Sequence, residues 1–148
     1  MIGDQKMSEI ILISGGFDPI HSGHIKLIKD ANKKGDVVVL LNSDEWLRNK
    51  KGREFLPFNE RKIIMESIKG VIEVIEFDDS DKTCIDGIKK AKSIFKNKVI
   101  KFANGGDRNN KTTPEKEAPF FSTICSEDTL CIYFTSTPLI FILSSAMN

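Results

Sequence analysis

The chain has 148 residues, a net charge of +1, 40% hydrophobic residues and 29% charged residues. These values fit a single globular core and exclude general disorder. They also argue against nucleic acid as a partner, because binding a long polyanion needs a strongly basic face, whereas a small anionic ligand stays compatible with them.

Short apolar runs alternate with segments of helical periodicity along most of the chain. The polar, basic stretch 43–55 is expected to be a loop. The alternation predicts βαβ units with right-handed crossovers, so the expected fold class is α/β, a Rossmann-like open parallel sheet with helices on both faces. The expected elements are strand 9–14, helix 22–34, strand 36–42, helix 59–70, strand 71–77, helix 84–95 and strand 98–104.

The composition changes after Ala118, since residues 119–148 contain only Glu127 and Asp128 as charged side chains. We therefore divide the chain into a domain at 1–118 and an atypical segment at 119–148. That segment is expected to be an edge strand with a tail, or an altered terminus produced by a changed reading frame or a truncated gene. Its uncharged run 129–146 reaches the length of a membrane span, but Pro138 and the absence of flanking basic residues favour no membrane anchor.

The three cysteines form no CxxC pair, and two histidines are too few for a zinc-type ligand set. The sequence therefore predicts no metal held by the protein itself. The apolar run near the N-terminus is shorter than that of a signal peptide, so we expect free thiols and a cytoplasmic location.

Both histidines follow directly on the first predicted strand, which ends in Gly15 and Gly16. In an open parallel sheet, ligands bind at the carboxyl ends of the strands, where the first turn offers free backbone amides and a positive helix end. His21 and His24 are three residues apart, which places both rings on one side of the first helical turn. This pattern predicts a phosphate site. The absence of GxGxxG disfavours a dinucleotide-dependent oxidoreductase.

The stretch GGFDPIHSGH, residues 15–24, resembles the signature of the HxGH nucleotidyltransferase superfamily. Residues 41–68, LNSDEWLRNKKGREFLPFNERKIIMESI, resemble the next segment of its cytidylyltransferase branch, which contains the glycerol-3-phosphate cytidylyltransferases and heptose-phosphate nucleotidyltransferases. The resemblance covers residues 10 to about 115. It implies transfer of a nucleotidyl group, most often cytidylyl, from CTP or ATP to a small phosphorylated polyol or sugar, with release of pyrophosphate.

The resemblance also implies roles for individual residues. In the family, a lysine of the loop after the second strand neutralises phosphates; Lys50 matches it, and its neighbours Lys51 and Arg53 could substitute for it. Mg²⁺ would arrive with the triphosphate, held by phosphate oxygens and water, and a homodimer is implied as well. The implied catalytic residues are His21, His24, Lys50 and Arg61, and the implied nucleotide-binding residues are Gly15, Gly16, Phe17, Asp18, Gly23, Gly106 and Asp107.

Several alternatives stay open from the residues alone. The Ser/Thr motif that the family carries near its C-terminus has no clear match, because TSTP at 135–138 does not begin an amphipathic helix. A catalytically defective nucleotide-binding homologue is therefore one alternative. Another is an adenylyltransferase acting on a coenzyme precursor, because GGFDP also resembles those groups. Arg61 could instead be a surface residue paired with a glutamate, and Trp46 could either stack on a base or cover the edge of the core.

Overall fold

The computed structural model describes residues 9–104, 121–126 and 129–134. Their strands form a six-stranded sheet in the order β3-β2-β1-β4-β6-β5. The first four strands in this order, β3, β2, β1 and β4, are parallel to one another, as predicted. Strand β6 runs antiparallel to β4, and β5 runs antiparallel to β6. The strands are β1 (Ile10–Gly15), β2 (Asp36–Leu41), β3 (Val71–Glu76), β4 (Ile100–Asn104), β5 (Phe121–Ser126) and β6 (Thr129–Phe134).

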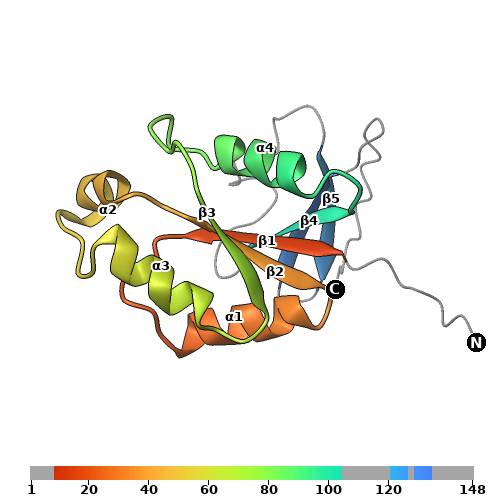
Figure 1. Ribbon diagram of the computed structural model, residues 1–148, viewed down its shortest axis with the longest axis horizontal. Coiled ribbons are helices and arrows are strands. Elements are labelled where there is room, and N and C mark those ends of the chain that lie inside the picture. The colour runs from red at the N-terminus through yellow and green to blue at the C-terminus, as the bar shows by residue number, and fades with distance from the viewer. Residues whose placement is uncertain (1–8, 105–120, 127–128, 135–148) are drawn as a thin grey trace, which may run out of the picture.

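The helices within the described ranges are α1 (Ser22–Asn32), α2 (Asp44–Lys51), α3 (Phe58–Glu66) and α4 (Ile85–Ile94). Figure 1 shows α4 above the sheet and α1 and α3 below it, which confirms helices on both faces. The sheet separates two apolar clusters. Ile10 and Leu12 of β1 pack in the cluster that contains α4 residues, whereas Ile11 and Ile13 pack in the cluster that contains α1 and α3 residues. Because successive side chains of a strand point to opposite faces, one apolar run serves both clusters.

Helix α2 was not expected, and the prediction of a loop over 43–55 is wrong for its first part. The Ser43 hydroxyl accepts a hydrogen bond from the Trp46 N–H at 3.0 Å, and Asp44 and Glu45 occupy the first turn. Gly52 ends the helix with a φ of +90°. A good N-cap, acidic residues at the positive end and a glycine C-cap stabilise a short helix even though it has little apolar periodicity.

The C-terminal segment contributes the hairpin of β5 and β6 to the sheet. The run 129–146 thus begins with a β-strand, and no helix of the described part of the chain is long and apolar enough to cross a membrane. The division of the chain at residue 118 stays a prediction. Gly106, Asp107 and the TSTP stretch lie outside the described residues.

A close approach of β1 and β2 at Gly35 generates a test of the fold. The Asp36 N–H donates to the Glu9 carbonyl oxygen at 2.8 Å, and a Cβ on Gly35 would overlap that same oxygen. We expect Gly35→Ala to lower the free energy of unfolding by about 2–3 kcal/mol, because the strand ends must move apart. Urea denaturation measures this. In the control Gly52→Ala, the new Cβ meets no atom within 4 Å, so only the backbone penalty of about 1 kcal/mol applies. Equal losses in the two variants would contradict the close approach.

Candidate active site

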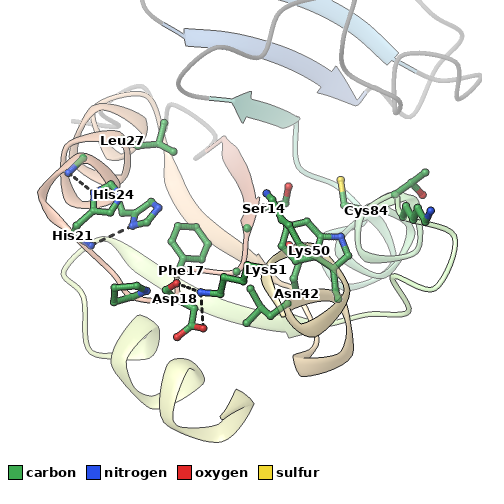
Figure 2. A pocket seen from close by; sticks show the side chains of 18 of the residues that line it. Ser14, Phe17, Asp18, His21, His24, Leu27, Asn42, Lys50, Lys51 and Cys84 are labelled. Atoms are coloured by element: carbon green, nitrogen blue, oxygen red, sulfur yellow. Dashed lines mark hydrogen bonds and ion pairs between the residues drawn. The ribbon is translucent and has the colours of Figure 1, made fainter. Parts of the chain in front are cut away.

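A pocket of about 580 Å³ opens at the carboxyl ends of the strands. Its walls come from the turn after β1, the first turn of α1, helix α2 and the loop between β3 and α4 (Figure 2). The pocket brings together most of the residues that were expected to bind the nucleotide or to act in catalysis, although they come from separate helices, strands and loops. Those that line it are Gly15, Gly16, Phe17, Asp18, His21, Gly23, His24 and Lys50.

The two histidines form a reciprocal cap at the start of α1. The Nδ1 atom of His21 accepts from the Gly23 N–H at 3.1 Å, and Nδ1 of His24 accepts from the His21 N–H at 3.2 Å. Their rings are stacked with centroids 3.8 Å apart. An imidazole nitrogen that accepts a hydrogen bond carries no proton, so each neutral ring holds its proton on Nε2. The pair therefore presents Nε2–H donors, both on one side of the helix, as the spacing predicts.

Burial and ring contacts tune His24 further. Its ring packs edge-on against Phe17, with centroids 5.0 Å apart. Desolvation lowers the pKa of His24 below its ordinary value of 6.5, and the nearby His21 lowers the pKa further. His24 is therefore a neutral donor at neutral pH, and stacking two imidazoles this closely entails no repulsion between two positive charges.

Asp18 faces away from the pocket centre and joins the first turn to the segment before α3. Its fully buried carboxylate accepts from the N–H groups of Phe55 at 2.7 Å and Leu56 at 2.9 Å. Lys51 pairs with the same carboxylate at 2.9 Å and also donates to the Asp18 carbonyl oxygen. Burial alone would raise the pKa of Asp18, but the hydrogen bonds from Phe55, Lys51 and Leu56 together lower it. Asp18 thus shapes the site by bonding to protein groups.

The three cations considered for phosphate contact lie in different places. Lys50 lines the pocket with its ammonium 4.4 Å from the centroid of the Trp46 ring, and no carboxylate pairs with it among the described residues. Lys51 is neutralised by Asp18, and Arg53 lies against the Phe55 ring at 5.1 Å. Figure 2 shows Lys50 on the side of the pocket away from the two histidines. Trp46 also lines the pocket.

Arg61 is buried and is not among the residues that line the pocket, so the alternative of a surface residue is wrong, whereas its catalytic role stays a prediction. Its guanidinium donates to the carbonyl oxygens of Leu56 at 3.0 Å, Gly16 at 2.9 Å and Asn42 at 2.8 Å. It also pairs with Asp44 at 2.6 Å. The planar guanidinium of an arginine carries five N–H donors in a fixed geometry, so it can satisfy acceptors that lie in several directions around it, whereas a lysine has three donors on one nitrogen. In this structure Arg61 thus holds together the turn after β1, the end of β2, the segment before α3 and the first turn of α2.

Comparison with known proteins agrees with this geometry. The family model described as cytidylyltransferase-like matches residues 12–118. The chain belongs to the cytidylyltransferase-like family of nucleotidyltransferases. Glycerol-3-phosphate cytidylyltransferase of Bacillus subtilis is 39% identical over 66 residues, which are 44% of this chain and 51% of that protein. The bifunctional protein HldE of Shigella sonnei is 30% identical over 113 residues, covering 67% of this chain and 24% of that protein.

Among solved structures, the lipopolysaccharide core biosynthesis protein of Thermoplasma volcanium superposes with a TM-score of 0.52 at 27% identity. The match covers 57% of this chain and 69% of that one. By the matches given above, this chain spans about half the length of the Bacillus relative and about a quarter of the length of the Shigella relative. The residues that the family model matches, 12–118, include the turn after β1 and both histidines of this chain.

The sequence pattern did not predict that Asp79 joins the loop after β3 to the loop after β2. Asp79 is buried, and its carboxylate accepts from the Asn42 side chain at 3.0 Å, the Ser43 N–H at 2.8 Å and the Ser43 hydroxyl at 2.7 Å. Asp79 thereby holds the cap of α2, the helix that carries Trp46 and Lys50. The available signal was the position of Asn42 and Asp79 just after parallel strands, where polar side chains meet at one sheet edge.

The histidine arrangement predicts a defined tautomer. At pH 8 we expect long-range ¹H–¹⁵N NMR spectra to show the Nε2–H form for both rings. The titration midpoint of His24 should lie below 6.5, because burial disfavours its charged form. In His21→Ala the midpoint should rise but stay below 6.5, since burial is the larger cause. An Nδ1–H form on either ring would contradict the reciprocal cap.

The Asp18 contacts predict a pH dependence of stability. A carboxylate whose pKa is lowered on folding stabilises the protein above its unfolded value of 3.8, and this contribution is lost as the pH falls through the folded pKa. We expect Asp18→Asn to lower the free energy of unfolding by about 1.5–3 kcal/mol at pH 7 and to flatten its decrease below pH 4. Urea titrations at several pH values measure both effects.

The control for this test is Asp30→Asn, which removes a surface carboxylate whose pKa is lowered to about 2 by Lys26 and Lys33. Exposed ion pairs contribute little to stability, so this variant should change it at pH 7 much less than Asp18→Asn. An equal loss in both variants would show that Asp18 is no more than a surface charge.

Proposed function

We propose that this chain transfers a nucleotidyl group, with CTP as the preferred donor, to the phosphate of a small polyol or sugar and releases pyrophosphate. The observation that carries the proposal is the pair of Nε2–H donors of His21 and His24 beside the glycine turn of one pocket. The family and the printed name of the Bacillus relative, a glycerol-3-phosphate cytidylyltransferase, support the reaction class and the choice of CTP.

The donor's phosphates would bind against the turn after β1 and the first turn of α1. Gly16 lets helix α2 pack closely there, because a Cβ on it would lie 2.5 Å from a Leu47 methyl group. Backbone amides at a helix start and imidazole N–H groups favour bound phosphate. The same donors, held rigidly by the cap of α1, would stabilise the charge that grows on the α-phosphate during substitution.

In the reaction, an oxygen of the acceptor phosphate attacks the α-phosphorus, and the bond between the α- and β-phosphates breaks. The electron pair of that bond leaves with pyrophosphate. No covalent protein intermediate is needed, so catalysis consists of in-line positioning and charge neutralisation. Among the described residues no carboxylate pairs with Lys50, whereas Lys51 is paired with Asp18, so Lys50 would neutralise phosphate oxygens.

Mg²⁺ fits this pocket as a partner of the nucleotide. Among the described residues no cluster of three or more His, Cys, Asp or Glu side chains could hold a metal ion. The carboxylate of Asp18 already accepts two N–H groups and a lysine. We therefore propose that phosphate oxygens and water coordinate the ion, whose contribution is to neutralise triphosphate charge.

A pyrophosphate-release assay tests the proposal. CTP and ATP are each paired with glycerol 3-phosphate and a panel of sugar phosphates and phosphorylated coenzyme precursors. We expect turnover with CTP and a phosphorylated polyol or sugar, and a loss of about 100-fold or more in kcat for His21→Ala. Lys29→Ala, an exposed position on the same helix, is the control and should leave kcat unchanged.

The other outcomes separate the alternatives. Preference for ATP and a coenzyme precursor would replace the proposal with an adenylyltransferase. Calorimetric binding of CTP or ATP without pyrophosphate release from any pair would indicate a defective homologue. Full activity in His21→Ala would remove the two histidines from the site.

A further inference from the structure

Trp46 and Lys50 lie one helical turn apart on α2, and both line the pocket. Side chains four residues apart on a helix are neighbours on one face. The Lys50 ammonium accordingly lies 4.4 Å from the centroid of the Trp46 ring. This distance is inside the range of about 6 Å over which the face of an aromatic ring attracts a cation. The indole ring is therefore the group against which the Lys50 ammonium rests.

The Trp46 ring is itself held by the elements around it. The Trp46 N–H donates to the Ser43 hydroxyl at 3.0 Å in the cap of α2. A Cβ on Gly16 would lie 3.5 Å from Cζ3 of Trp46, so the edge of the ring packs against the glycine turn. An aromatic side chain has fewer rotatable bonds than a lysine and loses less conformational entropy when it is fixed. The ring thus gives the flexible lysine a fixed contact at the pocket wall.

A ring holds a cation in a different way from a carboxylate. A carboxylate paired with Lys50 would neutralise its charge and repel phosphate, whereas an aromatic ring attracts the ammonium and leaves the positive charge intact. Among the described residues no carboxylate pairs with Lys50, and carboxylates near α2 pair with other cations. These pairs are Asp18 with Lys51, Asp44 with Arg61 and Glu54 with Arg48.

We propose that Trp46 is a positioning residue whose ring holds the Lys50 ammonium at the pocket by a cation–π interaction, so that the ammonium keeps its charge for phosphate oxygens of the bound substrates. The inference rests on the proposed function, in which Lys50 neutralises phosphate oxygens. A lysine that is already held loses less conformational entropy when the substrates bind. For an exposed cation–π pair, the expected effect on kcat/KM is about two- to fivefold.

The test changes the electrostatics of the ring and keeps its shape. In the full chain, Trp46, the single tryptophan, is replaced by monofluoro-, difluoro- and trifluorotryptophan. Fluorine withdraws electron density from the ring and so weakens its attraction for a cation. In the pyrophosphate-release assay we expect kcat/KM to fall stepwise with the number of fluorine atoms, by about two- to fivefold for the trifluoro ring.

Lys50→Met is the matched background, because it keeps a long side chain and removes the charge. Its kcat/KM should be lower than that of the wild type and should not depend on fluorination, whereas an effect of fluorine on folding would act in both backgrounds. Asn49→Ala, at an exposed position of α2 outside the pocket, should leave kcat/KM unchanged. Trp46→Phe should retain more activity than Trp46→Leu, because phenylalanine keeps an aromatic face.

A binding measurement separates this inference from turnover. Inorganic tripolyphosphate is the probe, and its Kd is measured by calorimetry for the unmodified and fluorinated chains. We expect the Kd to rise with fluorination by a factor similar to the loss in kcat/KM, and to be insensitive to fluorination in Lys50→Met. Such a graded response requires the cation, and a ring that only fills space would not produce it.

The outcomes distinguish this inference from the proposed function. Pyrophosphate release that is insensitive to fluorination, or equally sensitive in Lys50→Met, would overturn the role of Trp46 and leave the transfer reaction standing. A rise in kcat/KM on fluorination would also overturn it, because the ring would then withhold the ammonium from the substrates. Tripolyphosphate binding that depends on fluorination, without pyrophosphate release from any pair of substrates, would support the Trp46–Lys50 interaction and overturn the transfer reaction.

Discussion

The buried guanidinium of Arg61 is the interaction on which the geometry of the site depends. It donates to carbonyl oxygens at the ends of β1 and β2 and before α3, and it pairs with Asp44 in the first turn of α2. These backbone oxygens would otherwise be buried without partners, at a cost in free energy. One side chain thus sets the relative positions of the glycine turn and α2, the elements that carry donors on either side of the pocket.

The net charge that a ligand meets in the pocket depends on the hydrogen bonds and ion pairs that the nearby carboxylates make with protein groups. Asp18 and Asp79 are close to the site, but both are buried among backbone N–H groups and side chains of neighbouring loops. Each therefore stabilises a loop and leaves the cavity without a competing negative charge. Lys50 and Lys82 both line the pocket, and neither pairs with a carboxylate of the described residues. Cationic side chains without counter-charges favour an anion in the cavity.

The two histidines join the folding of α1 to the chemistry of the site. The Nδ1 atoms that cap the helix are the same atoms whose lone pairs decide that Nε2 carries the proton. Gly23 is necessary to this arrangement, because a Cβ there would lie 2.9 Å from Cε1 of His21. A helix cap made from ordinary serine or aspartate would satisfy the backbone equally well and would offer no N–H donor to a ligand.

The sequence by itself determined the alternation of strands and helices, the α/β class and the pairing of His21 with His24. Apolar runs and contacts between residues three positions apart depend only on residues that are close along the chain, so the local sequence pattern is enough to predict them. Only the tertiary structure decided that Arg61 points inward, that Lys51 is neutralised while Lys50 is not, and that Lys82 belongs to the pocket. The reason is that these outcomes depend on partners far along the chain, such as Gly16 for Arg61 and Asp18 for Lys51, which meet only when the strands assemble into one sheet edge.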